Sequence, residues 1–407
     1  MLRSRTLAFV VTSAVMLTGP VAFSTPASAN GNCVTYFAGN GTGTPASPYL
    51  VSSQLDLEEV AFCLGASFLQ TADIGLTGAW TSLGSSGTPF SGTYDGGGFG
   101  ISDLTVTASG TDNAGLFGYT DGAVLTRINI RSGSVTGRDN VGGLAGSARN
   151  SSITSSSSAA SVSGRDNVGG LAGSMTWTSG ARRALTTSFS TGSVTSTGNY
   201  SGGLLGKASQ LSISDAYATG SVTGDWQVGG LIGENDTSTL TNVYATGLVT
   251  DSIASNAVGG VMGQQTAGTY AGVTWDINTT GQNYSDVDAT VTTGSTTTQM
   301  KTMSTFTNFG WNISSTWNES GAATWLQCPA TNSGYPFLSA FFTLATSGCP
   351  AQGNADLTIW HLSIGRDFND SACPTGYSPS WAQWPHGRSG GWVCNREVFA
   401  YRPLLAS

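Results

Sequence analysis

Apolar residues in the middle of the chain recur with a long period. The segment Asn140-Val141-Gly142-Gly143-Leu144-Ala145-Gly146 returns unchanged at Asn167 to Gly173. With the glycine before Leu or Val as the marker, six copies stand at positions 115, 143, 170, 203, 230 and 260, at steps of 28, 27, 33, 27 and 30 residues. A fixed period of about 20 to 50 residues is typical of stacked repeats. The longest step indicates an insertion around Met175 to Arg183.

Alternation within each unit predicts β-strands. In the stretch Ala218 to Gly224, Gly220 and Val222 share one face and the intervening hydroxyl residues share the other. Two further apolar positions follow each glycine segment. They predict three short strands per unit, and in the third strand a valine such as Val222 should point inward. A lone unit cannot bury its apolar row, whereas stacked units share one core. We therefore predict an all-β fold, a parallel β-helix or β-solenoid of about six to eight coils.

Both ends of such a stack need a cover, because unpaired strand edges recruit other chains. Ser53 and Asp56 have the spacing of a capping box and predict a short N-terminal helix with an apolar face. The segment from Met300 to Phe342 breaks the repeat and predicts an aromatic lid at the far end. Its aromatic residues are Trp311, Trp317, Trp325, Phe337 and Phe341.

The composition supports a β-protein and limits its partners. Charged residues make up 9% of the chain, against about 25% in an average globular protein, and there are 57 glycines. Acidic residues outnumber basic ones by 23 to 15, so clustered lysine and arginine for binding nucleic acid are lacking. No cofactor is indicated.

The first residues predict export. Arg3 and Arg5 precede the apolar run Leu7 to Leu17 and the small residues Ala27-Ser28-Ala29, which is the layout of a signal peptide. The apolar run is too short to span a membrane. We expect a secreted, extracellular or cell-surface protein without a membrane span.

The six cysteines all follow this segment, and an even number in an exported chain favours disulfides. Neighbours in sequence suggest Cys33 with Cys63, Cys328 with Cys349 and Cys373 with Cys394, among fifteen connectivities. The predicted organisation is a signal peptide at 1–29, a cap and lead-in at 30–110, repeats at 111–281, a closing segment at 282–350 and a Cys/Trp-rich module at 355–407.

The repeats resemble those of the GLUG family through the Gly-Leu-apolar-Gly cores Gly143-Leu144-Ala145-Gly146 and Gly230-Leu231-Ile232-Gly233. The resemblance extends upstream through Pro89 to Gly96 as far as Pro48-Tyr49-Leu50-Val51, and downstream through Trp275-Asp276 to Tyr335-Pro336-Phe337-Leu338. It covers about residues 44 to 340. It implies an exported or surface protein, in some cases adhesive. Some relatives are joined to a metallopeptidase, but this chain lacks the His-Glu-x-x-His zinc motif and has only two histidines.

The C-terminal module resembles a Cys/Trp-rich module of exported actinobacterial proteins. Flat indoles can stack on sugar rings, so glycan contact is one hypothesis, and a small core around a disulfide is the other. The candidate binding residues are Tyr377, Trp381, Trp384 and Trp392.

Catalytic chemistry is poorly represented. Gly387-Arg388-Ser389-Gly390-Gly391 matches the Gly-x-Ser-x-Gly pattern, but it lies between Pro385 and Trp392 and not between a strand and a helix. Asp112, Asp139 and Asp166 recur in successive coils, where Arg138 and Arg165 favour alternating ion pairs over a calcium ladder or a catalytic row. No complete catalytic set is evident, and an enzyme is not favoured.

Hydroxyl residues form the other candidate surface. Aligning the units places threonines in rows one strand wide, on a face predicted to be exposed. Such rows suit sugar binding, resemble the face of ice-binding solenoids, or are ordinary residues of a solvated sheet. The candidates are Thr191, Thr195, Thr219, Thr223, Thr246 and Thr250.

Three functions follow from these observations. The first is a non-catalytic surface, adhesion or glycan-binding protein, with cell-wall or extracellular glycans or a surface protein as partner. The alternatives are a secreted polysaccharide lyase or hydrolase and an ice-binding protein with a threonine and serine ladder.

Overall fold

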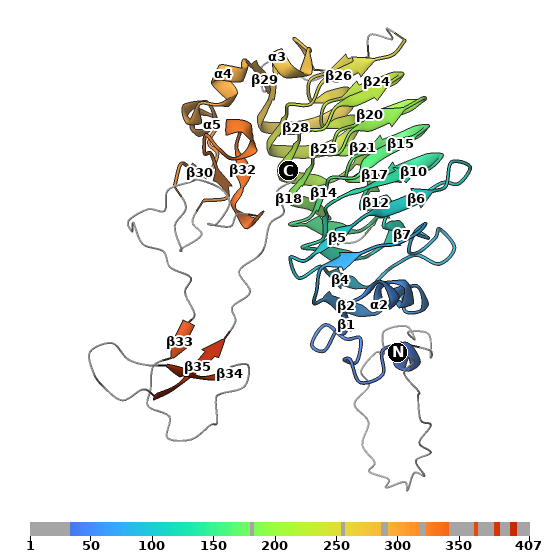
Figure 1. Ribbon diagram of the computed structural model, residues 1–407. Helices are drawn as coiled ribbons and strands as arrows, with labels where there is room; N and C mark the ends of the chain where they lie inside the picture. Colours follow the sequence, from blue (N-terminus) through green and yellow to red (C-terminus); the bar gives the residue numbers. More distant parts are fainter. Residues whose placement is uncertain are drawn as a thin grey trace, which may run out of the picture.

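The computed structural model describes residues 33–179, 183–253, 257–285, 292–316 and 323–341, and the backbone of three strands between 362 and 396. Successive coils stack along one axis, from the blue N-terminal cap to the yellow last coil (Figure 1). Every strand pair in the stack is parallel, as the repeats predict. The fold is a β-solenoid.

Three sheets form the walls of the solenoid. The five-stranded sheet contains β11 (Asp139–Gly142), β16 (Asp166–Gly169), β20 (Asn199–Gly202), β24 (Trp226–Gly229) and β27 (Val258–Gly259). The six-stranded sheet contains β6 (Leu104–Thr107), β10 (Gly133–Thr136), β15 (Ser161–Gly164), β19 (Val194–Ser196), β23 (Val222–Gly224) and β26 (Val249–Asp251). The 18-stranded sheet contains β1 (Tyr49–Val51), β2 (Ser67–Gln70), β3 (Ile74–Gly75), β4 (Thr93–Asp95), β5 (Gly100–Ser102), β7 (Phe117–Asp121), β8 (Val124–Thr126), β9 (Asn129–Ile130), β12 (Ala145–Arg149), β13 (Ser152–Thr154), β14 (Ser157–Ser158), β17 (Ala172–Thr176), β18 (Ala184–Ser190), β21 (Leu205–Ser209), β22 (Ser212–Ala218), β25 (Ile232–Ala245), β28 (Met262–Asp276) and β29 (Thr292–Ser295).

The register confirms the predicted steps between coils. One column runs through Phe117, Ala145, Ala172, Leu205, Ile232 and Met262. The coil from β11 to β15 has five short strands, so the expectation of three was too low. The insertion also begins later than predicted, because Met175 pairs within β17 and the extra residues follow Thr176.

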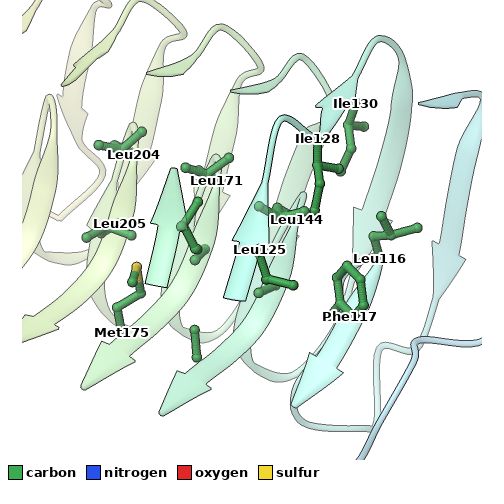
Figure 2. Packing of buried hydrophobic residues seen from close by; sticks show 14 of the residues in the cluster. Leu116, Phe117, Leu125, Ile128, Ile130, Leu144, Leu171, Met175, Leu204 and Leu205 are labelled. Carbon is green, nitrogen blue, oxygen red and sulfur yellow. The ribbon is translucent and has the colours of Figure 1, made fainter. Parts of the chain in front are cut away.

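Aliphatic columns fill the interior, where successive leucines lie over one another (Figure 2). Leu116, Leu144 and Leu171 are fully buried at equivalent positions. Val222 is buried and Ser221 exposed, as the alternation predicts. Because each coil buries its apolar side chains against the next, the core is continuous along the stack.

The N-terminal end is covered by short helices, α1 (Cys33–Tyr36), α2 (Gln54–Glu59) and the 3-10 helix η1 (Val60–Phe62). Ser53 caps α2 by accepting a hydrogen bond from the backbone N–H of Asp56, as predicted. The Asp56 carboxylate accepts from the N–H of Ser52, so the reciprocal half of a capping box is not formed. The predicted Cys33–Cys63 disulfide joins α1 to the residue after η1.

At the opposite end, Trp275 closes the core. Its indole lies against Gly260, where an added β-carbon would come within 2.0 Å of Cδ1. The indole N–H donates to the carbonyl of Gln282 (2.8 Å), and α3 (Ile277–Thr280) follows directly. The end of the stack is therefore covered by Trp275 and the residues after it.

The segment predicted as a lid packs on the side of the solenoid, where Figure 1 shows it in orange. It contains α4 (Thr297–Met300), α5 (Met303–Asn308), β30 (Ile313–Ser314), β31 (Trp325–Leu326), η2 (Asn332–Gly334), β32 (Phe337–Leu338) and η3 (Ser339–Phe341). The rings of Phe189, Tyr217 and Tyr244 stack in successive coils, and Trp325 contacts the two tyrosines. The lid prediction was wrong in its position, because this outward aromatic column is what recruits the segment.

The three C-terminal strands are antiparallel and are described by their backbone. They are β33 (Leu362–Ile364), β34 (Ser378–Ala382) and β35 (Gly391–Arg396). The predicted signal peptide, Trp317, Cys349 and Cys373 lie outside the described residues. Cys328 is buried and disulfide-bonded.

Candidate functional surfaces

The outer face of the six-stranded sheet carries the predicted hydroxyl rows. The register aligns Val194, Val222 and Val249 on the inside, which places the residues on either side of them in outward columns. The longest column contains Thr107, Thr136, Ser163, Thr195, Thr223 and Thr250. We call the outward hydroxyls of β6, β10, β15, β19, β23 and β26 and of the residues leading into them the hydroxyl face.

Two shorter columns flank the longest one. Thr191, Thr219 and Thr246 follow the aligned positions Ser190, Ala218 and Ala245. The other column contains Ser134, Ser161, Ser193 and Ser221, and Leu248, which is 55% exposed, interrupts it. The strands of this sheet contain one charged residue, Asp251. The face therefore offers neutral donors and acceptors at the spacing of parallel strands, about 4.8 Å.

A second hydroxyl column lies on the 18-stranded sheet and was not predicted. Thr126, Thr154, Thr186, Ser214 and Thr241 occupy equivalent positions there. This column is single and half-buried. It provides a natural comparison for the wider and more exposed hydroxyl face.

The recurring aspartates lie in an ion-paired row at the edge of the five-stranded sheet. Arg138 Nε lies 2.6 Å from Asp112 and 3.5 Å from Asp139, and Arg165 bridges Asp139 (2.5 Å) and Asp166 (3.0 Å). The hydrogen bond from Arg138 holds the pKa of Asp112 below its usual range. The alternating ion pairs are as predicted, and guanidinium groups face the carboxylates that were candidate calcium ligands.

An asparagine ladder stands beside this row. Asn140 donates to the side-chain oxygen of Asn113 (3.2 Å), and Asn167 donates to that of Asn140 (3.1 Å). All three have positive φ, between 53° and 63°, a region that asparagine tolerates better than most residues. The recurrence of Asn before the glycine segment was the signal for this ladder in the sequence.

The aromatic candidates of the C-terminal module are placed in part. Trp381 in β34 and Trp392 in β35 are directly opposite in the antiparallel register. Tyr377 and Trp384 lie outside the described residues. Glycan contact by these aromatic residues therefore stays a prediction.

Within the described parts of the chain, no group of three or more His, Cys, Asp or Glu side chains is arranged to hold a metal ion. Among these same residues, no helix is long and apolar enough to cross a membrane. The predicted absence of a catalytic set is not tested by these observations.

Comparisons with known proteins address the repeat directly. The model of the GLUG motif matches residues 224–250, which contain the core Gly230 to Gly233. These residues carry a GLUG motif. In the matched unit Leu231 and Ile232 are buried, and a β-carbon on Gly233 would lie 2.5 Å from the backbone of Tyr200. In the GLUG pattern the two central residues are thus aliphatic because they point inward, and the last residue is glycine because neighbouring coils approach closely there.

Two relatives extend the comparison. The chain is 35% identical to Halomucin from Haloquadratum walsbyi over an alignment of 125 residues that covers 26% of this chain and 1% of Halomucin. The chain thus matches a very small part of that protein's length. A crystal structure of a putative immunoglobulin A1 protease from Bacteroides ovatus superposes with a TM-score of 0.59 at 19% identity, over 75% of this chain and 96% of that one. At this identity the likeness supports the solenoid fold alone.

Proposed function

We propose that this protein is an extracellular, non-catalytic surface protein whose hydroxyl face binds glycans. The observation that carries the proposal is the alignment over six coils of threonine and serine side chains, of which Thr107, Thr195 and Thr250 are exposed and the others half-buried. Sugar hydroxyls both donate and accept hydrogen bonds, and so do these side chains. A repeating polymer meets the same groups at each coil, so weak contacts add along its length.

Other features are consistent with an extracellular location. The Cys33–Cys63 disulfide belongs to the oxidising side of a membrane. The GLUG repeat and the partial match to Halomucin suggest a surface role. We further propose that the C-terminal module, with Trp381 and Trp392 paired across its strands, contributes a second glycan or cell-wall contact.

Binding to glycan arrays and to purified cell walls tests the proposal. The triple variant T195V/T223V/T250V removes three hydroxyls from the face and keeps the β-branched shape, so we expect it to fold and to bind at least tenfold more weakly. T154V/T186V/T241V makes the same change in the column on the 18-stranded sheet and serves as the control. Equal loss in both variants, or no binding by the parent protein, would overturn the proposal.

A chain truncated after Ala355 separates the two contacts. Retained array binding assigns the glycan to the solenoid, and its loss assigns the glycan to the C-terminal module. The same glycans, incubated with the protein and analysed for shortened products, test the lyase or hydrolase alternative. Release of product would replace the binding proposal with an enzymatic one.

Ice binding is the second candidate, and the regular register of the hydroxyl face favours it. A flat array of hydroxyls at a fixed spacing suits a periodic surface such as a crystal lattice. A single thermal-hysteresis measurement on the parent protein and on T195V/T223V/T250V decides this candidate. A freezing point equal to the melting point removes it.

A further inference from the structure

The repeat breaks in three adjacent columns within the same two coils. The aspartate row continues as Asn199 and then Trp226. The asparagine ladder continues as Tyr200 and then Gln227, which keep the positive φ of the asparagines. The aligned serines Ser147 and Ser174 continue as Lys207 and then Glu234. The repeated residues form the scaffold of the solenoid. Several changes of residue type in adjacent columns therefore indicate a local function.

Two of the columns that change, the asparagine ladder and the aligned serines, are neighbours in space, and Trp226 directly precedes Gln227 of the ladder in the chain. A β-carbon on Gly206 would lie 2.4 Å from the backbone of Asn167, and one on Gly233 would lie 2.5 Å from that of Tyr200. The residue after each of these glycines is Lys207 or Glu234. The Lys207 ammonium lies 5.2 Å from the centre of the Tyr200 ring and 2.6 Å from Glu234 Oε2. We call Tyr200, Lys207, Trp226, Gln227 and Glu234 the break cluster.

The environment of these side chains differs from that of an ordinary surface. Glu234 is 8% exposed, and it is paired with Lys207, one of two lysines in the chain. The side-chain oxygen of Gln227 is buried without a hydrogen-bond partner, so nothing in the described structure fixes that amide. Trp226 is 46% exposed. The exposed indole gains from a ligand that covers it, and the unpaired Gln227 oxygen gains if its side chain turns to meet a hydrogen-bond donor of that ligand.

The chemistry of the break cluster selects a class of ligand. Indole and phenol rings offer flat apolar faces, while the amide, carboxylate and ammonium offer donors and acceptors around them. Since Lys207 and Glu234 compensate each other, a charged ligand gains little net attraction. We infer that the break cluster is a subsite for a neutral sugar residue, stacked on Trp226 and hydrogen-bonded by Gln227, Glu234 and Lys207. This inference rests on the proposed glycan binding and adds a defined subsite outside the hydroxyl face.

The neighbouring coils supply the variants for a test, because they show which residues the scaffold tolerates. W226N introduces the residue of the preceding coil, Y200N restores the asparagine ladder, and K207S/E234S introduces the serine found at the equivalent positions Ser147 and Ser174. Calorimetric titration with cello-, malto-, manno- and chito-tetraose measures affinity, and thermal unfolding verifies the fold. We expect W226N and K207S/E234S each to weaken the best ligand at least tenfold, without loss of cooperative unfolding.

The outcomes separate this inference from the proposed function. If array binding persists and falls in T195V/T223V/T250V but not in W226N or K207S/E234S, the subsite is overturned and the hydroxyl face stands. If binding falls in the break-cluster variants and not in the threonine variant, the subsite stands and the hydroxyl face is overturned. If no sugar, neutral or acidic, binds the parent protein in the array or the titration, both are overturned. An acidic sugar bound in place of neutral ones contradicts the inference alone.

Discussion

Gly143 and Ser158 face each other across the interior of one coil, and a β-carbon on Gly143 would lie 2.1 Å from Ser158 Oγ. The relationship repeats with Gly170 and Ser190, and with Gly203 and Ala218 at a β-carbon distance of 2.8 Å. Opposite walls of the solenoid are therefore in contact at the marker glycine. The first glycine of the motif is required by this contact, since any side chain there would meet the other wall.

Replacing Gly143 with alanine should destabilise the protein by about 1 to 3 kcal/mol, because the added methyl group overpacks the interior. Urea unfolding followed by circular dichroism measures the change. G143A/S158G should recover part of the loss, since the nearest atom is then removed. G110A is the control, because Gly110 has no atom within 4 Å of a β-carbon and its φ is not positive. A G143A variant as stable as G110A would contradict the contact.

Trp275 should be essential to the end of the stack. W275A removes a 4% exposed indole and should cost about 3 to 5 kcal/mol. The uncovered end should also promote self-association, visible by light scattering. W226A removes a half-exposed indole elsewhere and should change stability by less than about 0.5 kcal/mol. Equal effects of the two substitutions would show that Trp275 does not close the core.

The Cys33–Cys63 disulfide should stabilise the N-terminal cap. It closes a loop of 30 residues, for which chain entropy predicts about 3 to 4 kcal/mol. C33S/C63S should therefore unfold at lower urea concentration than the parent under non-reducing conditions. With reductant added, the parent should approach the variant. A parent that is insensitive to reductant, although its free thiol count rises, would contradict this prediction.

Buried tyrosines should make the protein sensitive to alkali. Burial, together with the hydrogen bond that Tyr335 donates to Asp276, raises the pKa of Tyr335 to about 12. The folded-state pKa is thus above the unfolded value of about 10, so the stabilisation is complete below pH 10 and is lost as the pH rises through 12.

Phenolate absorbance during a pH titration tests this prediction. Burial also raises the pKa of Tyr94, Tyr217 and Tyr244, so these phenols should ionise together with unfolding. Y335F should show a weaker loss of stability between pH 10 and 12. A titration in which every tyrosine ionises near pH 10 with the fold intact would disprove the buried positions.

The asparagine ladder should depend on backbone conformation as well as on hydrogen bonds. Asn140 has φ of 54°, which alanine adopts at a cost of about 1 to 2 kcal/mol and glycine adopts freely. N140A and N140G both remove the ladder contacts, so N140A should be the less stable of the two by about 1 kcal/mol. Equal stability, measured by thermal unfolding, would show that the conformation carries no cost.

The sequence predicted the structure well where a residue pattern repeats in every coil, and less well where the pattern changes. Period and alternation predicted the parallel stack, the inward position of Val222 and the hydroxyl rows. The number of strands per coil was underestimated, because segments as short as Ser157–Ser158 leave no periodic signal. Phe189, Tyr217 and Tyr244 recur at one position in three coils, and this aromatic column could have indicated the lateral position of Trp325. The break cluster was hidden, because its residues are far apart in the repeat until the register aligns them.

The matched register of neighbouring coils also bears on length. Asp139 pairs with Asp166 and Val135 with Val162, so equivalent residues of neighbouring coils are 27 positions apart. A segment of 27 residues therefore contains one complete coil with all its internal contacts. A gene that duplicates residues 140–166 would insert a layer whose upper and lower surfaces already fit their new neighbours. Such a protein would reach about 4.8 Å farther while keeping both termini unchanged. The length of the solenoid can therefore increase by duplication of a coil, independently of what the exposed faces bind.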